Sequence, residues 1–456
     1  HSTDPARHTM NDANAPTLRS IRACLEGAIP AVTATCAPDG TPNVAYISQV
    51  VYVDEGHVAL SFQFFNKTRQ NILANPCATV LVMDPVTARY FRLYLRYLRT
   101  ETTGALFERM KAQLAGIASH EGMAEVFALK GSDVYAVERI EPLPGEGLPP
   151  APPRADLLGA LRLCSQRLAR CATLDELLQA LLAGLREHFT IQHAMVLMLD
   201  APAGQLYTVA SCGYPHSGVG SEIRLGQGVI GVAAREATPV RIGHVTHAAL
   251  YSHTLRSNLA VDGATPGPDI PYPGLAHPHS QLAVPLVSSG RTLGVLFVES
   301  QLDLQFRYPE EDALMTLAGQ LAVAIDLLQR PDEPSETASP VVATAPPQGQ
   351  PLRVRHFAAN GSVFVNDAYL IKGVAGAILC KLLREHAASG RTEFSNRELR
   401  LDRSLGLPDV ADNLEARLLL LQRRLQESQL GIRLEKAGRG RVRLGLDAPV
   451  RLEWIA

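Results

Sequence analysis

The chain has 456 residues, 46% hydrophobic and 19% charged, a balance that excludes an intrinsically disordered protein and fits about three domains. Its 43 Lys and Arg against 45 Asp and Glu give a formal net charge of -2, so no global charge excess indicates nucleic acid. The seven cysteines are scattered and form no CxxC pair, which favours a reducing compartment over a disulfide framework.

Neither a membrane-spanning segment nor a signal peptide is apparent, because no apolar run reaches the roughly 18 residues that a spanning helix needs. The residues before Met10 read like a vector-derived scar, and we expect the native chain to begin at Met10. A soluble cytoplasmic protein is the expectation. Two proline-rich segments, 142–154 and 331–351, have too little apolar surface to offset the entropy of ordering. We therefore predict three domains, at 15–141, 155–330 and 352–456.

The first predicted domain is rich in short strands. Residues 31–53 predict two strands around Asp39-Gly40, a strong hairpin signal, and further strands are expected at 57–65 and 78–84. A short helix is expected between the last two, over 66–76. Several short strands at regular spacing favour a barrel.

This stretch resembles the FMN-binding split barrel of the pyridoxamine-phosphate-oxidase-like family. That family places a polar, basic tripeptide after the third strand, where cations, hydroxyls and a helix start can bind phosphate. The resemblance implies a phosphate site at Asn66, Lys67, Thr68 and Arg69, and a flavin ring along Tyr46, Ile47, Ser48 and Gln49 with Ser61, Phe62 and Gln63 opposite.

Two alternatives stay open for this barrel. It can have kept its shape and lost its flavin, since fold does not dictate function. Oxidase activity is the less favoured reading, because the Arg-rich C-terminal signature of true pyridoxamine-phosphate oxidases is missing. The stretch 89–99 mixes Arg and Tyr and permits an RNA-stacking stripe, but we favour a barrel strand.

The second predicted domain opens with helical periodicity over 156–185, broken at Ala172-Thr173, where Thr173 and Glu176 match a capping box. Five motifs follow in chain order: Gly213-Tyr214, Gly226-Gln227-Gly228, residues 280–286, residues 294–296 and Glu299-Ser300. In this order and spacing they resemble a GAF domain over nearly its full length. The resemblance implies a central antiparallel sheet, helices behind it, and a ligand pocket under a loop on the other side.

The loop between Ile242 and Ser280 is long enough to be a functional lid. Five histidines follow one another within it, and neutral imidazole is the commonest metal ligand, so a metal or haem site is one hypothesis. Its candidate ligands are His244, His247, His253, His277 and His279. Their spacing matches no standard closed zinc site, and an organic effector or an empty pocket is the favoured alternative.

The third predicted domain is basic, with 18 Lys and Arg against 12 Asp and Glu from residue 352 onward. A hairpin, three helices and a glycine-turn hairpin follow in order, which resembles the winged helix-turn-helix effector domain of response regulators. The resemblance implies DNA contacts from Arg417, Arg423 and Arg424 on a recognition helix and from Lys436, Arg439, Arg441 and Arg443 on the wing.

Leu418-Leu419-Leu420-Leu421 departs from that pattern, because four consecutive leucines cover every face of a helix. Either this helix packs against another domain or subunit, or its DNA-reading surface is reduced. A winged-helix protein-interaction module is the alternative to DNA binding.

Together these features predict a multidomain α+β protein made of a split β-barrel, a GAF sandwich with an antiparallel sheet, and a winged helix. The leading hypothesis is a homodimeric one-component transcriptional regulator that senses a small molecule or redox signal, with FMN or a related flavin as possible cofactor. A flavin-dependent oxidoreductase with regulatory domains and a protein-binding scaffold are the alternatives. No membrane partner is expected.

Overall fold

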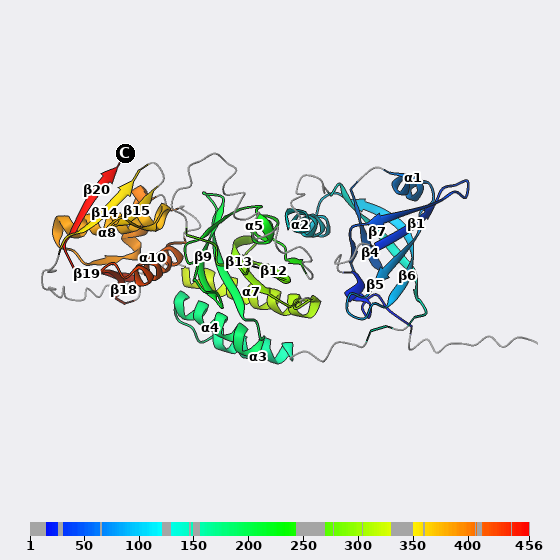
Figure 1. Ribbon diagram of the computed structural model, residues 1–456, viewed down its shortest axis with the longest axis horizontal. Helices are drawn as coiled ribbons and strands as arrows, with labels where there is room; N and C mark the ends of the chain where they lie inside the picture. Colours follow the sequence, from blue (N-terminus) through cyan, green and yellow to red (C-terminus); the bar gives the residue numbers. More distant parts are fainter. Residues whose placement is uncertain are drawn as a thin grey trace, which may run out of the picture.

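Three bodies lie in a row in the computed structural model, and the middle body contacts both of the others (Figure 1). The structure describes residues 15–25, 31–63, 66–120, 129–145, 147–148, 156–242, 270–276, 278–302, 304–329, 350–358, 361–405, 407, 413–438 and 440–455. Within these ranges no helix is long and apolar enough to cross a membrane.

The first body is a seven-stranded antiparallel sheet in the order β2-β1-β5-β6-β7-β4-β3. Its elements are η2 Arg22–Leu25, β1 Ala31–Cys36, β2 Pro42–Ile47, β3 Val50–Tyr52, β4 His57–Phe62, α1 Lys67–Ala74, β5 Cys77–Met83, β6 Tyr90–Glu101, α2 Ala105–His120 and β7 Gly131–Pro142.

The hairpin at Asp39-Gly40 and the helix after β4 lie where the sequence predicts them. The second expected strand differs, because the chain breaks at Ser48-Gln49 into two strands at opposite edges of the sheet. The stretch 89–99 is a strand, as favoured, and Arg92, Arg96 and Arg99 each pair with a glutamate.

The second body is a six-stranded antiparallel sheet in the order β10-β9-β8-β13-β12-β11. Its elements are α3 Leu157–Leu168, α4 Leu174–His188, β8 His193–Asp200, β9 Gln205–Cys212, β10 Glu222–Arg224, α5 Gly228–Glu236, β11 Val240–Ile242, β12 Ser280–Ser288, β13 Arg291–Ser300 and α7 Tyr308–Gln329.

Two separate apolar clusters lie on the two faces of this sheet, as the alternation of its strands requires. Leu282 and Val284 belong to the cluster under α4 and α7, while their neighbour Ala283 belongs to the cluster under α5. The predicted capping box forms at the start of α4, between Thr173 and Glu176.

The third body combines two small sheets, β16-β15-β14-β20 and β17-β19-β18, with three α-helices among the described residues. Its elements are β14 Leu352–Phe357, β15 Ser362–Val365, β16 Ala368–Ile371, α8 Gly373–Ser389, β17 Glu393–Ser395, α9 Asn396–Leu401, η3 Arg403–Leu405, α10 Leu414–Ser428, β18 Ile432–Lys436, β19 Arg441–Leu446 and β20 Val450–Ile455. The expected helices and hairpins are present, whereas β14, β17 and β20 had no predicted counterpart.

The second and third bodies share one apolar core. A single cluster of buried side chains runs from Ala160 in α3 through the sheet to Leu444 in β19. On the other side, α2 of the first body packs on α5, Arg22 pairs with Asp312 at 3.0 Å, and the Tyr308 hydroxyl donates to the Leu25 carbonyl at 2.9 Å.

Candidate functional site

A small pocket of about 90 Å³ lies in the first body, at the N-terminus of α1. Nine of the residues expected to hold a flavin line it: Tyr46, Ile47, Ser48, Ser61, Phe62, Gln63, Asn66, Thr68 and Arg69. Two others lie beside the lining, since Gln49 is buried in the chain between β2 and β3, and Lys67 is exposed in the first turn of α1.

Asn66 builds the start of this helix, because its side chain accepts a hydrogen bond from the backbone N–H of Arg69 at 3.1 Å. Asn43 of β2 ties the helix to the sheet by donating to the Thr68 hydroxyl at 2.9 Å. The N-terminal turn of α1 thus lies at one end of the pocket, and its first residue, Lys67, is exposed.

Arg69 is committed to a partner inside the pocket. Its guanidinium donates to Asp133 at 2.6 Å and to the Thr100 hydroxyl at 2.9 Å, and it stacks 4.4 Å from the centre of the Phe62 ring. Burial raises the pKa of Asp133, while Thr100 and Arg69 act in the opposite direction. Asp133 lies on β7, far along the sequence, and no sequence signal marked it.

One acceptor in the pocket has no partner among the described residues. The Gln63 side chain donates through Nε2 to the Ser48 hydroxyl at 2.9 Å, while its Oε1 is buried without a hydrogen-bond partner. A buried orphaned acceptor is costly unless a ligand or water satisfies it. One edge of a flavin ring carries an N–H group between two carbonyl groups. This N–H could donate a hydrogen bond to Gln63 Oε1.

The pocket therefore suits one part of a flavin, the polar edge of its ring, better than the phosphate. The ring edge fits the polar floor of Ser48, Ser61 and Gln63, whereas the phosphate would depend on Lys67 and the first amides of α1, because Asp133 already neutralises Arg69. The pocket volume of about 90 Å³ is below the roughly 300–1,000 Å³ of whole-ligand pockets, so only part of a flavin ring would fit inside it.

The second body buries a carboxyl on the sheet face under α5. Glu299 is 1% exposed, and its two oxygens accept hydrogen bonds from the Leu275 N–H at 2.8 Å and from Gln281 Nε2 at 3.1 Å. Burial raises the pKa of Glu299 and, together with that carboxyl, holds the pKa of Tyr214 well above its ordinary range. This polar group lies beside an apolar cluster that includes Met195 and Phe297.

Of the five histidines suggested as metal ligands, the structure describes one. His244, His247, His253 and His277 lie outside the described residues. His279 is described, and its backbone N–H donates to Ser300 at 2.7 Å. Across the described ranges, no group of three or more His, Cys, Asp or Glu side chains is arranged to hold a metal ion.

The residues expected to contact DNA are divided between two surroundings. On α10, the Arg417 guanidinium pairs with Asp200. The Arg423 guanidinium pairs with Asp175 and donates to the Val209 carbonyl. The Arg424 guanidinium donates to the Leu370 carbonyl. On the β18–β19 hairpin, Arg443 pairs with Glu393, whereas Lys436 and Arg441 form no ion pair with a described residue. Arg439 lies outside the described residues.

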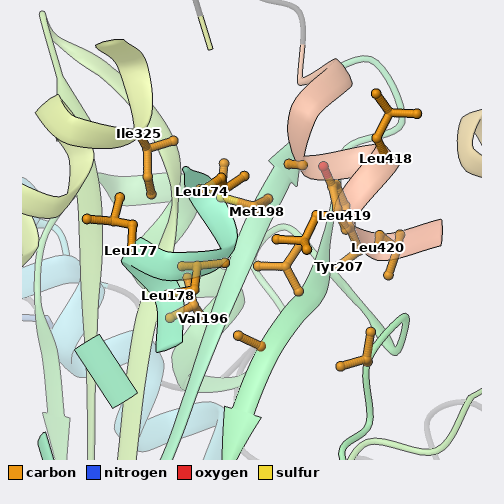
Figure 2. Close-up of a cluster of buried hydrophobic side chains, with 14 of the residues drawn as sticks. Leu174, Leu177, Leu178, Val196, Met198, Tyr207, Ile325, Leu418, Leu419 and Leu420 are labelled. Atoms are coloured by element: carbon orange, nitrogen blue, oxygen red, sulfur yellow. The ribbon is translucent and has the colours of Figure 1, made fainter. Parts of the chain in front are cut away.

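The leucine run on α10 is buried along its whole length. Leu418 to Leu421 are each 6% exposed or less, and Figure 2 shows Leu419 and Leu420 close to Tyr207 of β9. Of the two explanations that the sequence left open, packing against another domain is what the structure shows.

Comparison with known proteins identifies two parts of the chain. The family model described as GAF domain matches residues 173–325, and the one described as pyridoxamine 5'-phosphate oxidase matches residues 18–138. Neither match reaches the third body. No curated protein matched the chain.

Several solved structures resemble single bodies. The GAF domain of a phosphoenolpyruvate-protein phosphotransferase from Coxiella burnetii is 21% identical, with 38% of this chain and 94% of that chain covered and a TM-score of 0.30. Free methionine-R-sulfoxide reductase from Neisseria meningitidis is 22% identical, with 38% and 90% covered and a TM-score of 0.30. An FMN-binding protein from Syntrophomonas wolfei is 18% identical, with 28% and 86% covered and a TM-score of 0.25.

The matched ranges coincide with the first and second bodies, and the third body follows them in the same chain. Residues 18–138 are therefore a pyridoxamine 5'-phosphate oxidase-like domain, and residues 173–325 are a GAF domain.

Proposed function

We propose that this chain is a one-component transcriptional regulator, in which the oxidase-like and GAF domains sense a small molecule or redox signal and the third body binds DNA. The observation that carries the proposal is the third body itself. Its helices α8, α9 and α10 followed by the β18–β19 hairpin have the order of a winged helix, and the body carries an excess of six positive charges.

The hairpin supplies the accessible cations. Lys436 is exposed and Arg441 is partly exposed, and both come from strands that flank the turn at Gly438 and Gly440. Cations at the tip of a wing meet phosphates and position the protein without reading sequence. An enzyme has no evident use for such a hairpin, which favours the regulator over the oxidoreductase.

DNA binding is tested with the full chain by fluorescence anisotropy of a labelled mixed-sequence duplex over a series of salt concentrations. Lys436→Ala with Arg441→Ala should weaken binding and flatten the salt dependence by about one counterion unit per lost contact. Arg451→Ala, an exposed cation on β20, is the matched control and should leave the slope unchanged. An unchanged slope in the wing variant would count against DNA binding by this hairpin.

The oxidase-like domain is proposed to hold FMN or a related flavin at the α1 pocket. The support comes from the family match, the lining residues and the orphaned Gln63 oxygen. A bound flavin would supply one- or two-electron redox chemistry, and the role of this chain is to hold the ring edge with Gln63 and the phosphate with Lys67 and the α1 amides.

Flavin binding is tested by titrating the full chain with FMN and with riboflavin, followed by flavin fluorescence. Lys67→Ala should weaken FMN binding several-fold and leave riboflavin binding unchanged, because only FMN carries the phosphate. Arg96→Ala, a cation paired with Glu138 outside the pocket, is the control. Equal affinity of the wild-type chain for both flavins would contradict the phosphate assignment.

We also propose a homodimer. The edge strand β2 exposes Val44 and Tyr46, the latter 82% exposed, and Tyr46 borders the α1 pocket. A second copy on this edge would cover the apolar side chains and the open side of the pocket. A monomer mass in light scattering at micromolar protein concentration would contradict it.

A further inference from the structure

The GAF domain holds α10 by the face that the proposed DNA-binding helix needs. Helix α10 packs against β9 and α4, and Leu420 lies close to Tyr207 of β9 (Figure 2). The Leu420 side chain also lies 3.7 Å from the position that a Cβ would take at Gly220. Asn413, at the N-cap of α10, donates to the Leu199 carbonyl at 2.6 Å. The start of the helix is therefore fixed to the end of β8.

The ion pairs across this contact all have one polarity. Three ion pairs join the described residues of the two bodies, and in each the cation belongs to the third body and the carboxylate to the GAF domain. They are Arg417 with Asp200 at 2.6 Å, Arg423 with Asp175 at 2.5 Å, and Lys372 with Glu222 at 2.8 Å. Asp200 and Asp175 of the GAF surface thus bind the guanidinium groups of Arg417 and Arg423, two of the residues expected to contact DNA.

The Arg417 pair is the best sheltered of the three. The side chains of Arg417 and Asp200 are 8% and 13% exposed, and the guanidinium lies 5.1 Å from the centre of the Tyr207 ring. Burial raises the pKa of Tyr207 to about 12, as expected for a phenol away from water. A helix that is covered in this way cannot enter a major groove, whose floor its side chains must reach.

We propose that the acidic GAF surface formed by Asp175, Asp200 and Glu222 competes with DNA for α10, so that the arrangement seen here is the form that does not bind DNA through this helix. The inference rests on the proposed function, because it assigns the regulation of the same helix. Two bodies that compete for one face give a two-state equilibrium, and DNA binding falls by the fraction of chains in the open state.

The same strands connect this contact to the interior of the sensor. In β9, Leu206 belongs to the cluster under α5, while its neighbour Tyr207 faces α10. In β8, Met195 and Leu197 belong to that cluster, while Asp200 at the end of the strand holds Arg417. A ligand that moves β8 and β9 would act directly on the carboxylates that hold α10.

The test is a charge reversal in the full chain. Glu222→Lys places two like charges at the Lys372 contact and should open it, and Glu222→Lys with Lys372→Glu should close it again. Glu187→Lys makes the same change of net charge at an exposed pair with Arg167 and is the matched control. A second opening variant, Asp175→Asn with Asp200→Asn, removes the carboxylates without adding positive charge.

Two measurements are made on each variant: hydrogen–deuterium exchange of the α10 amides, and anisotropy of a labelled mixed-sequence duplex at low ionic strength. Both opening variants should exchange faster over α10 and bind the duplex about tenfold more tightly than the control, as expected when the competent fraction rises. The charge swap should return exchange to the wild-type rate.

Faster exchange without tighter binding, in a chain whose wild type binds DNA, overturns the competition and leaves the proposed function standing. Unchanged exchange in both opening variants overturns it as well, because the carboxylates then do not hold α10. No binding by any variant, despite faster exchange, overturns the proposed function itself.

Discussion

Arg69 illustrates how a residue can have the type that a site needs and yet be occupied. The family resemblance placed Arg69 among the expected phosphate ligands, but the sheet brings Asp133 of β7 to within 2.6 Å of the guanidinium. Both side chains are largely buried, so the pair is screened from water. The pair joins α1 to the sheet, so the proposed phosphate would depend on other groups.

Removing one member of this pair is therefore expected to be costly. Asp133→Ala should lower the free energy of unfolding by about 3–5 kcal/mol, because it leaves Arg69 buried without its counterion. Glu138→Ala on the same strand breaks an exposed pair with Arg96 and should change little. Urea denaturation of both variants measures the difference, and equal midpoints would show that Arg69 finds another partner.

The buried Glu299 carboxyl should make the stability of the folded state depend on pH. Its pKa is raised above the ordinary value of 4.5 by burial, so the folded state binds this proton more tightly than the unfolded chain does. The corresponding stability is fully present below the ordinary pKa and is lost as pH rises through the raised one. The melting temperature of wild type should fall relative to Glu299→Gln across that interval, and parallel curves for the two proteins would contradict the assignment.

At the scale of elements, close approaches set the connections of the GAF sheet. Gly213 follows β9 with φ +86°, and a Cβ there would lie 2.0 Å from the Gln192 carbonyl oxygen. Gly204, in the turn before β9, also has positive φ, but a Cβ there would meet nothing within 4 Å. A substitution at Gly204 therefore tests backbone strain alone, whereas one at Gly213 tests strain together with a backbone clash.

Alanine at each glycine should give different results. Gly204→Ala should lower the free energy of unfolding by about 1–2 kcal/mol, the cost of a left-handed backbone for an L-residue. Gly213→Ala should cost clearly more, because the start of β8 must also move. Thermal denaturation followed by circular dichroism compares the two, and a similar loss in both would mean that the β8 connection yields without cost.

At the scale of the whole molecule, the segments between the bodies should be the first sites of proteolysis. The GAF domain ends with α7 at Gln329 and the third body begins with β14 at Leu352, while the segment 331–351 is rich in Pro, Ala and Thr. Limited digestion should cut first within 142–154 and 331–351. Early cleavage inside α10 instead would indicate that the contact with the GAF domain is open in solution.

Local patterns in the sequence determined the elements whose causes are also local. The Asp39-Gly40 turn, the capping box at Thr173 and the glycine-turn hairpin formed by β18 and β19 all lie where short-range signals predict them. Most of the α1 pocket lining comes from β2, β4 and α1, which are near one another in the sequence, and the family resemblance pointed to those residues. Family motifs added the identity of two domains.

Only the tertiary structure decided which partners distant residues take. Asp133 reaches Arg69, and Asp200 reaches Arg417, across separations that no local pattern encodes. The four leucines of α10 showed that a face had to be covered, but not that β9 and α4 cover it. Burial of apolar surface is non-directional. The sequence therefore determines how much apolar surface must be buried, while the packing of whole domains determines which partner buries it.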